Sequence, residues 1–192
     1  NQKIVLFMPR FLGDCVNCTA SIELLRSYYP GASFYLVIQD YIIPLFELDH
    51  DIECLVDTRK TGKFQGTKRL VNQLQEIEAD IAIMFTNKLV DALVAKLAGI
   101  PRRIGYNTEL RSLLLTDSLK FDKCRHYINR YAYLANRACN DNLSNLPSVK
   151  LNYNRSLSNI GSNRLTVGIS ILSPEKTSRH YPVESAIATI EL

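Results

Sequence analysis

Short apolar runs and longer amphipathic segments alternate along the first 140 residues of this 192-residue chain. Runs rich in β-branched and aromatic side chains predict strands at 3–8, 33–38, 53–56, 80–85 and 103–106. Between them, apolar residues recur every three or four positions, which predicts helices. Strands that alternate with helices are typical of βαβ units. The sequence therefore predicts an α/β fold with a Rossmann-like parallel sheet and right-handed crossovers.

The longer segments differ in how clearly they define a helix and its buried face. Residues 62–78 are amphipathic, and their predicted apolar face consists of Leu70, Val71, Leu74 and Ile77. Residues 87–98 predict a helix that ends at Gly99 and Pro101. The side chains expected to face inward are Leu89, Leu93, Val94 and Leu97. Residues 126–139 predict a further helix, and 40–48 a short one kinked by Pro44.

The composition changes after residue 139, and this change predicts the domain layout. Residues 1–140 form the expected first domain, and 141–163, rich in Asn and Ser, have the composition of a linker. Residues 164–171 predict a new strand, which a polar turn and a helix start at Val183 follow. These elements are too few to form a domain. We therefore expect 164–192 to be the truncated beginning of a second domain.

The basic residues are clustered, although the net charge of +4 is mild. A charge of this size gives no general argument for nucleic-acid binding. One stretch contains no acid and consists of Arg59, Lys60, Lys63, Lys68 and Arg69. A second stretch between residues 102 and 130 is diluted by acids. Most such side chains form solvated surface, so the clusters alone define no site.

Five cysteines, an odd number, argue against a disulfide framework and favour a reducing compartment. Cys15 and Cys18 form a C-x-x-C motif, but the adjacent Asp14 is expected to raise the pKa of a thiol, which disfavours redox chemistry. A zinc site is also disfavoured, because the sequence has no second C-x-x-C and no matched His pair. No apolar run is long enough to span a membrane.

Asp14 is the strongest candidate for chemistry. It follows the first strand, a turn and Gly13, and it stands at the start of a helix. Active sites of open α/β folds lie outside the carboxyl ends of the strands, where this order of elements places a carboxylate. The alternative role is helix capping, which Asp favours. A dinucleotide site is disfavoured, since that fingerprint needs three glycines at this turn and only Gly13 is present.

Several segments together resemble one known family. They are Val5-Leu6-Phe7-Met8-Pro9-Arg10-Phe11-Leu12-Gly13-Asp14, Ala98-Gly99-Ile100-Pro101-Arg102-Arg103-Ile104-Gly105-Tyr106, Leu113-Leu114-Leu115-Thr116-Asp117, Asn129-Arg130-Tyr131 and Arg179-His180-Tyr181-Pro182. Each is short, but the combination is similar to the ADP-heptose:lipopolysaccharide heptosyltransferases, glycosyltransferase family 9, and most closely to their heptosyltransferase II branch. The resemblance implies the N-terminal, acceptor-binding domain of a GT-B glycosyltransferase, followed by the start of its donor domain.

The resemblance also implies an activity and a set of site residues. Asp14 would be the general base in an inverting, metal-independent transfer of heptose from ADP-L-glycero-D-manno-heptose to the inner core of lipopolysaccharide. No cofactor and no nucleic acid would be involved, and the protein would act in the cytoplasm, in peripheral contact with the inner membrane. The donor would contact Gly13 and Arg179. The acceptor would contact Arg10, Lys88, Arg111, His126 and Arg130.

Two features depart from the family pattern. Arg179 stands where the family has a lysine, and Tyr181 replaces a tryptophan. Because guanidinium and ammonium groups bind phosphate differently, the first departure bears on donor binding. Two other functions stay open from the sequence. One is a non-catalytic Rossmann-like domain that binds an anionic glycolipid or nucleotide, and the other is a nucleotide-dependent oxidoreductase.

Overall fold

The computed structural model describes residues 1–60, 62–142, 148–152, 182, 184 and 187. Residues Asn1–Tyr153 form one compact unit, and Asn154–Leu192 form a second. The strand predicted at 164–171, the helix start at Val183 and the donor residue Arg179 lie outside the described residues.

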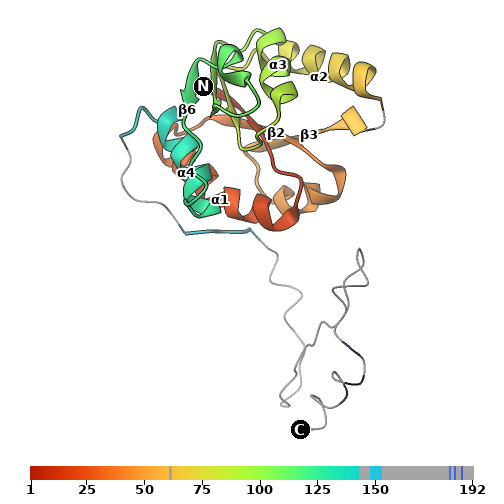
Figure 1. Ribbon diagram of the computed structural model, residues 1–192, viewed down its shortest axis with the longest axis vertical. Coiled ribbons are helices and arrows are strands. Elements are labelled where there is room, and N and C mark those ends of the chain that lie inside the picture. The colour runs from red at the N-terminus through yellow and green to blue at the C-terminus, as the bar shows by residue number, and fades with distance from the viewer. Residues whose placement is uncertain (61, 143–147, 153–181, 183, 185–186, 188–192) are drawn as a thin grey trace. The chain divides into compact units, whose positions relative to one another are not determined.

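Six parallel strands form the sheet of the first unit, in the order β3-β2-β1-β4-β5-β6 (Figure 1). Their bounds are β1 Lys3–Phe7, β2 Ser33–Ile38, β3 Ile52–Val56, β4 Ile81–Met84, β5 Arg102–Tyr106 and β6 Asp117–Leu119. The strand order reverses between β1 and β4, as in doubly wound Rossmann-like folds. The predicted fold class and its first five strands are confirmed. The three-residue β6 was not predicted, because a strand this short has almost no periodicity.

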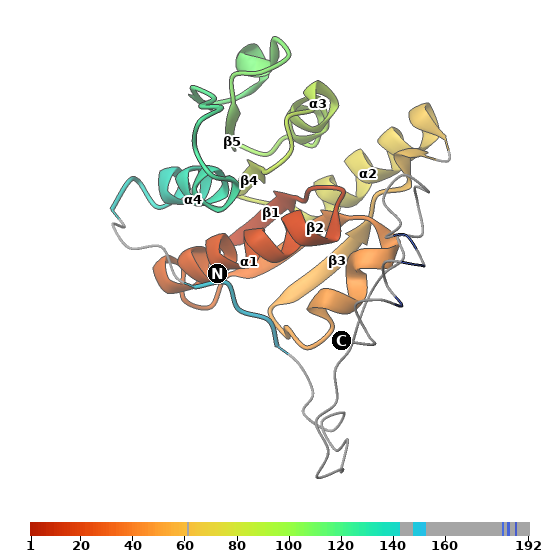
Figure 2. The same ribbon diagram turned by 60° about the horizontal axis from the view of Figure 1, so that its bottom comes forward.

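Helices cover both faces of the sheet (Figures 1 and 2). On one face lie α1 (Leu12–Tyr28) and α4 (Tyr127–Ala138), which pack against each other. On the other lie α2 (Lys63–Ile77) and α3 (Leu89–Leu97). Three 3₁₀ segments join these elements: η1 (Asp40–Phe46, with Pro44 inside it), η2 (Thr58–Lys60) and η3 (Arg111–Leu114). No helix in the described part of the chain is long and apolar enough to cross a membrane.

The run from Ile4 to Phe7 in β1 is apolar because both faces of this strand are covered. Ile4 and Leu6 pack into the core beneath α1 and α4, whereas Val5 and Phe7 pack into the core beneath α2 and α3. All four side chains are almost completely buried. A central strand with two covered faces needs apolar residues at every position, not at alternate ones.

The buried face of α3 differs from the prediction. Leu89, Leu93 and Leu97 are 42%, 39% and 54% exposed, although they were expected to face inward. Only Val94 of the predicted set is buried; the other residues on the buried face are Asp91, Ala92 and Ala95. The leucine spacing identified the helix correctly but indicated the wrong face. The helix packs against the sheet through Ala92 and Ala95 and turns the Asp91 carboxylate inward.

The amino end of α2 lies very close to η2. A Cβ atom on Gly66 would stand 2.8 Å from the carbonyl oxygen of Thr58 and 2.9 Å from Cα of Arg59. Both contacts are with backbone, so a side chain at Gly66 requires the two segments to separate. Gly62 has an extended backbone (φ −169°), and a Cβ there meets nothing closer than 4.0 Å.

We therefore expect Gly66→Ala to destabilise the protein by about 1–3 kcal/mol, the usual cost of overpacking, despite the better helix propensity of alanine. Thermal or denaturant unfolding measures the effect. Gly13→Ala is the matched control, because Gly13 also lies in a helix and a Cβ there meets nothing within 4 Å; it should not lower stability. Equal stabilities of the two variants would contradict the close approach of η2 and α2.

Residues 148–152 belong to the segment that the sequence assigns to a linker, yet they contact the first domain. The backbone N–H of Lys150 donates to Oγ1 of Thr19 on α1 at 3.2 Å. The amide of Asn152 donates to Oδ1 of Asp49 at 2.8 Å. Asp49 also binds Arg26 of α1 at 2.8 Å. This part of the chain therefore packs along α1 and the loop before β3.

Candidate functional site

The register of the sheet brings the loops after four strands to one edge. Phe7 of β1 pairs with Val37 of β2 and with Met84 of β4, and Val37 pairs with Leu55 of β3. The four strands thus end side by side. Because all strands are parallel, the residues that follow them gather at the same edge of the sheet, where α/β proteins bind ligands.

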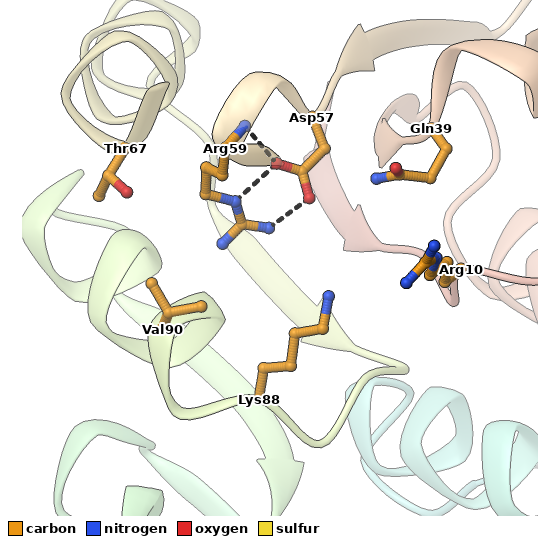
Figure 3. Close-up of a pocket in the computed structure, with 7 residues that line it drawn as sticks. All are labelled: Arg10, Gln39, Asp57, Arg59, Thr67, Lys88 and Val90. Atoms are coloured by element: carbon orange, nitrogen blue, oxygen red, sulfur yellow. Dashed lines mark hydrogen bonds and ion pairs between the residues drawn. The ribbon is translucent and has the colours of Figure 1, made fainter. Parts of the chain in front are cut away.

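A cavity of about 490 Å³ lies at this edge (Figure 3). It is lined by Arg10 after β1, Gln39 after β2, Asp57 and Arg59 after β3, Thr67 of α2, and Lys88 and Val90 after β4. Its volume lies within the range usual for small-molecule sites. Two of the residues predicted to bind the acceptor, Arg10 and Lys88, therefore come together here.

One wall of the cavity is a buried ion-pair network. Arg59 binds both oxygens of Asp57, with Nε at 2.7 Å and Nη2 at 2.8 Å. Its Nη1 donates to Oδ1 of Asp91 at 2.6 Å, and Asp91 also accepts a hydrogen bond from the hydroxyl of Thr86. Asp91, the carboxylate on the inner face of α3, is fully buried. The network thus joins the loops after β3 and β4.

The opposite charges in this network stabilise the ionised forms of Asp57 and Arg59. Burial alone would raise the pKa of Asp57, but its hydrogen bonds to Arg59 and the positive charges of Arg59 and Lys88 hold the pKa below its ordinary value. Burial acts to lower the pKa of Arg59, and the hydrogen bonds to Asp57 and the charge of Asp91 outweigh it, so the pKa is raised. Two carboxylates therefore neutralise the Arg59 guanidinium within the protein.

The side chains of Arg10 and Lys88 are exposed cations at the same cavity. Among the described residues, no ion pair engages either of them. Figure 3 shows the Lys88 side chain reaching into the space below the Asp57–Arg59 pair, with Arg10 to one side. These two cations are available for a ligand, and carboxylate or phosphate groups are the partners that suit them.

Asp14 lies in the first turn of α1, close to the carboxyl end of β1. The N-cap of this helix is Phe11, so the capping alternative for Asp14 is wrong. No hydrogen bond to its partly buried carboxylate is found among the described residues. A carboxylate near a helix N-terminus is stabilised by the helix dipole. Asp14 is not one of the residues that line the cavity.

Gly13 is a helical residue of α1, whereas the sequence suggested that it forms the turn. The turn itself is made by Pro9, Arg10 and Phe11. Gly13 is exposed, its φ is not positive, and a Cβ built there meets nothing within 4 Å. The backbone beside Asp14 is therefore open to the approach of a ligand.

Arg111 differs from its predicted role. It was expected to contact the acceptor, but it is 0% exposed. Its guanidinium donates to the carbonyl oxygens of Tyr106 at 2.6 Å and Thr86 at 2.8 Å. Burial lowers the pKa of Arg111 below that of a free arginine, and the charges of Asp91 and Glu109 oppose this effect. Because a fully buried cation does not reach a ligand, Arg111 is better described as part of the framework behind Lys88.

His126 and Arg130 lie together at the start of α4, as their spacing of four predicted. The exposed His126 is the N-cap residue, and its carbonyl accepts from the N–H of Arg130 at 3.0 Å. The Arg130 guanidinium lies over the rings of Phe121 and Tyr127, at 4.9 and 4.8 Å, and its Nε is buried without a hydrogen-bond partner. These residues form a group separate from the cavity.

The two thiols of the C-x-x-C motif are buried, and neither forms a disulfide. Burial raises the pKa of Cys15 to about 12, and the charge of Asp14 contributes in the same direction. The pKa of Cys18 is also raised by burial and by the charges of Cys15 and Asp14. The expectation that Asp14 raises the thiol pKa is confirmed. Within the described residues, no group of three or more His, Cys, Asp or Glu side chains is arranged to hold a metal ion.

Sequence reasoning did not identify Gln39, Asp57 or Thr67 as site residues, and it treated Arg59 only as part of a basic stretch. Gln39 and Asp57 could have been identified from the sequence, because each directly follows a predicted strand. The cavity exists only in the folded domain, because its lining residues follow four different strands.

The structure defines a Rossmann-like domain with a cation-lined cavity at the carboxyl edge of its parallel sheet. Residues 67–184 match the family model described as glycosyltransferase family 9 (heptosyltransferase). This match covers more than half of the chain. The chain therefore belongs to glycosyltransferase family 9.

Curated relatives and solved structures agree with this membership. Lipopolysaccharide heptosyltransferase 2 of Escherichia coli (strain K12) is 30% identical over 125 residues, which make up 64% of this chain and 36% of that protein. The Salmonella typhimurium protein of the same name is 28% identical over 139 residues, 70% of this chain and 40% of that protein. The chain thus spans well under half the length of these relatives.

The structure of E. coli ADP-heptose lps heptosyltransferase II matches with a TM-score of 0.68 and 25% identity, over 80% of this chain and 47% of that one. The structure of E. coli heptosyltransferase WaaC with ADP matches with a TM-score of 0.60 and 17% identity, over 71% and 46%. The second likeness concerns the fold alone. Together they identify the six-stranded unit as the N-terminal part of a GT-B heptosyltransferase fold.

Proposed function

We propose that this chain supplies the acceptor-binding half of an enzyme that transfers heptose from ADP-L-glycero-D-manno-heptose to the inner core of lipopolysaccharide. The observation that carries the proposal is the pair of exposed cations, Arg10 and Lys88, in one cavity, where Arg10 lies just before the helix that bears Asp14. Membership of glycosyltransferase family 9 supports the reaction type. The names of the relatives support the sugar and the acceptor.

In the proposed reaction, Asp14 is the general base. Its carboxylate takes the proton of an acceptor hydroxyl while that oxygen attacks the anomeric carbon of the heptose. The bond between the anomeric carbon and the phosphate oxygen breaks, and ADP leaves with the bonding electrons. Attack opposite to the leaving group inverts the anomeric configuration. A fixed carboxylate also stabilises the positive charge that develops at the sugar in the transition state.

Different residues of the chain are assigned to the acceptor and to the donor. We assign Arg10 and Lys88 to carboxylate or phosphate groups of the acceptor, together with His126 and Arg130 at the start of α4. On the family resemblance, Arg179 would bind the phosphates of the donor, and the open backbone at Gly13 would allow the sugar to approach Asp14. The reaction needs no cofactor, and we propose that it also needs no metal ion.

The test is transfer by the full-length product of the gene. Purified protein, ADP-heptose and a heptose-deficient inner-core oligosaccharide should give a product heavier by one heptose, and nuclear magnetic resonance should show the inverted anomeric configuration. The reaction should proceed in the presence of a chelator. Absence of product with both substrates present would contradict the proposed activity, and product of retained configuration would contradict the mechanism.

A second function is favoured by the location of the cavity. The described residues that line it all lie within Asn1–Tyr153, so the cations of the cavity belong to the first unit. This unit would then be a non-catalytic domain for an anionic glycolipid or a nucleotide. Calorimetric titration separates the alternatives: binding of oligosaccharide without any transfer by the full-length protein favours the second function.

A further inference from the structure

Residues 86–89 comprise three residues of the connection between β4 and α3 and the first residue of α3. They are held from the side of β5 through their backbone. The carbonyl of Thr86 accepts from Nη1 of Arg111 at 2.8 Å. The carbonyl of Asn87 accepts from the hydroxyl of Thr108 at 3.3 Å, and the N–H of Leu89 donates to Glu109 at 3.0 Å. We call residues 86–89 the Lys88 loop. Three residues of the β5–β6 connection, Thr108, Glu109 and Arg111, thus fix it.

The same loop is held from the side of β3. The hydroxyl of Thr86 donates to the buried carboxylate of Asp91, which Arg59 binds at 2.6 Å. Asp57 holds Arg59 in turn. The Lys88 loop therefore lies between two sets of polar contacts, and the Lys88 side chain itself is left exposed at the cavity.

Loops at the edge of a sheet are usually more mobile than the strands that they connect. A lysine on a mobile loop loses backbone and side-chain entropy when it binds an anion, which weakens binding. A loop that is already fixed avoids the backbone part of that loss. The anchoring contacts are therefore expected to increase the affinity of Lys88 for an anion.

We propose that Thr108 and Arg111 on one side, and the Arg59–Asp91 pair on the other, are positioning residues that fix the Lys88 ammonium in the cavity for an anionic group of the acceptor. This inference rests on the proposed function, because it takes Lys88 as an acceptor-binding residue. The chemistry of the group is that of a carboxylate or a phosphate, since an ammonium binds either as a point charge. The buried Arg111 thereby acts on the acceptor only through Lys88.

Thr108→Val is the test variant, because it removes one anchoring hydrogen bond at similar volume, whereas loss of the buried Arg111 risks unfolding. In the full-length protein, we expect the KM for the acceptor to rise about three- to tenfold, the equivalent of one hydrogen bond, while kcat stays within about twofold. The dissociation constant of inorganic phosphate, followed by nuclear magnetic resonance titration, should rise by a similar factor.

Thr116→Val is the matched control. Thr116 precedes β6 at the opposite edge of the sheet, where its hydroxyl accepts from the N–H of Arg103 at 2.8 Å. The Thr116 hydroxyl also lies within hydrogen-bond distance of the Arg103 carbonyl and of Asp117, so the control should lose at least as much stability as Thr108→Val. It should keep the wild-type KM and phosphate affinity. Equal changes in both threonine variants would show a merely structural role and overturn the proposal.

The variant Lys88→Ala distinguishes a failure of the positioning role from a failure of the proposed function. The inference predicts weaker phosphate binding in Lys88→Ala and in Thr108→Val. Weakening in Lys88→Ala alone overturns the positioning role, and no weakening in either overturns Lys88 as the anion-binding residue as well. If both variants bind phosphate more weakly but the wild-type enzyme transfers no heptose, the positioning role stands and the proposed reaction fails.

Discussion

Asp14→Asn in the full-length protein is expected to lower kcat for heptose transfer about 10²- to 10⁴-fold, the usual contribution of a general base. Asparagine has nearly the same shape, but it does not take a proton from the acceptor hydroxyl. Asp14 lies in the first turn of α1 without a hydrogen-bonding partner among the described residues, so the substitution breaks no observed contact. The change should therefore affect catalysis and leave the fold intact.

Initial rates at saturating donor and acceptor measure this effect, and circular dichroism checks the fold. Asp40→Asn is the matched control. Asp40 is an exposed carboxylate at the same edge of the sheet, in the first turn of η1 after β2. It should keep kcat within about twofold of wild type. Wild-type turnover by Asp14→Asn would exclude Asp14 as the base, whatever the acceptor.

The largest effect on stability is expected at Asp91. Asp91→Ala removes a fully buried carboxylate and leaves the Arg59 guanidinium and the Thr86 hydroxyl with one partner fewer. Breaking a buried ion pair from one side costs about 3–5 kcal/mol. For a chain of this size, such a loss lowers the midpoint of thermal unfolding by roughly 6–20 °C.

Differential scanning calorimetry provides the measurement, and two further variants show whether the ion pair is the cause. Asp122→Ala removes an exposed carboxylate, 4.0 Å from Arg125, and should cost less than about 1 kcal/mol. In the double variant Asp91→Ala/Arg59→Met, both charges are gone, so the loss should be smaller than the sum of the two single losses. Additive losses would show that the two residues stabilise the protein independently.

The functional importance of this network was not apparent from the sequence. Asp91 lies in a helix whose leucine spacing suggested that Leu89, Leu93 and Leu97 face inward. The inward position of an acid is favourable only because Arg59, 32 residues earlier in the chain, reaches it across the sheet edge. A pattern within one helix contains no information about a partner on another loop. Hydrophobic periodicity alone therefore assigned the wrong face.

The burial of Arg111 could not be predicted from the local sequence either. In the sequence it is one of several basic residues near a family motif, and nothing local separates a ligand-binding arginine from a buried one. In the structure its guanidinium is surrounded by backbone carbonyl groups of two loops, which satisfy its donors and hold it away from solvent. Arg10 and Lys88, by contrast, lie at one cavity because their loops directly follow the central strands β1 and β4.

The order of the first five strands and of the helices between them could be predicted from the amino-acid sequence alone, and so could the placement of Asp14 at the edge where α/β folds bind ligands. This was possible because apolar runs, helical spacing and the residues after each strand are local features. The tertiary structure decided which side chains meet in one cavity and which cations stay exposed. It also decided which face of α3 is buried. These properties depend on strand register and on contacts between distant loops, since burial and ion pairing are set by neighbours in space.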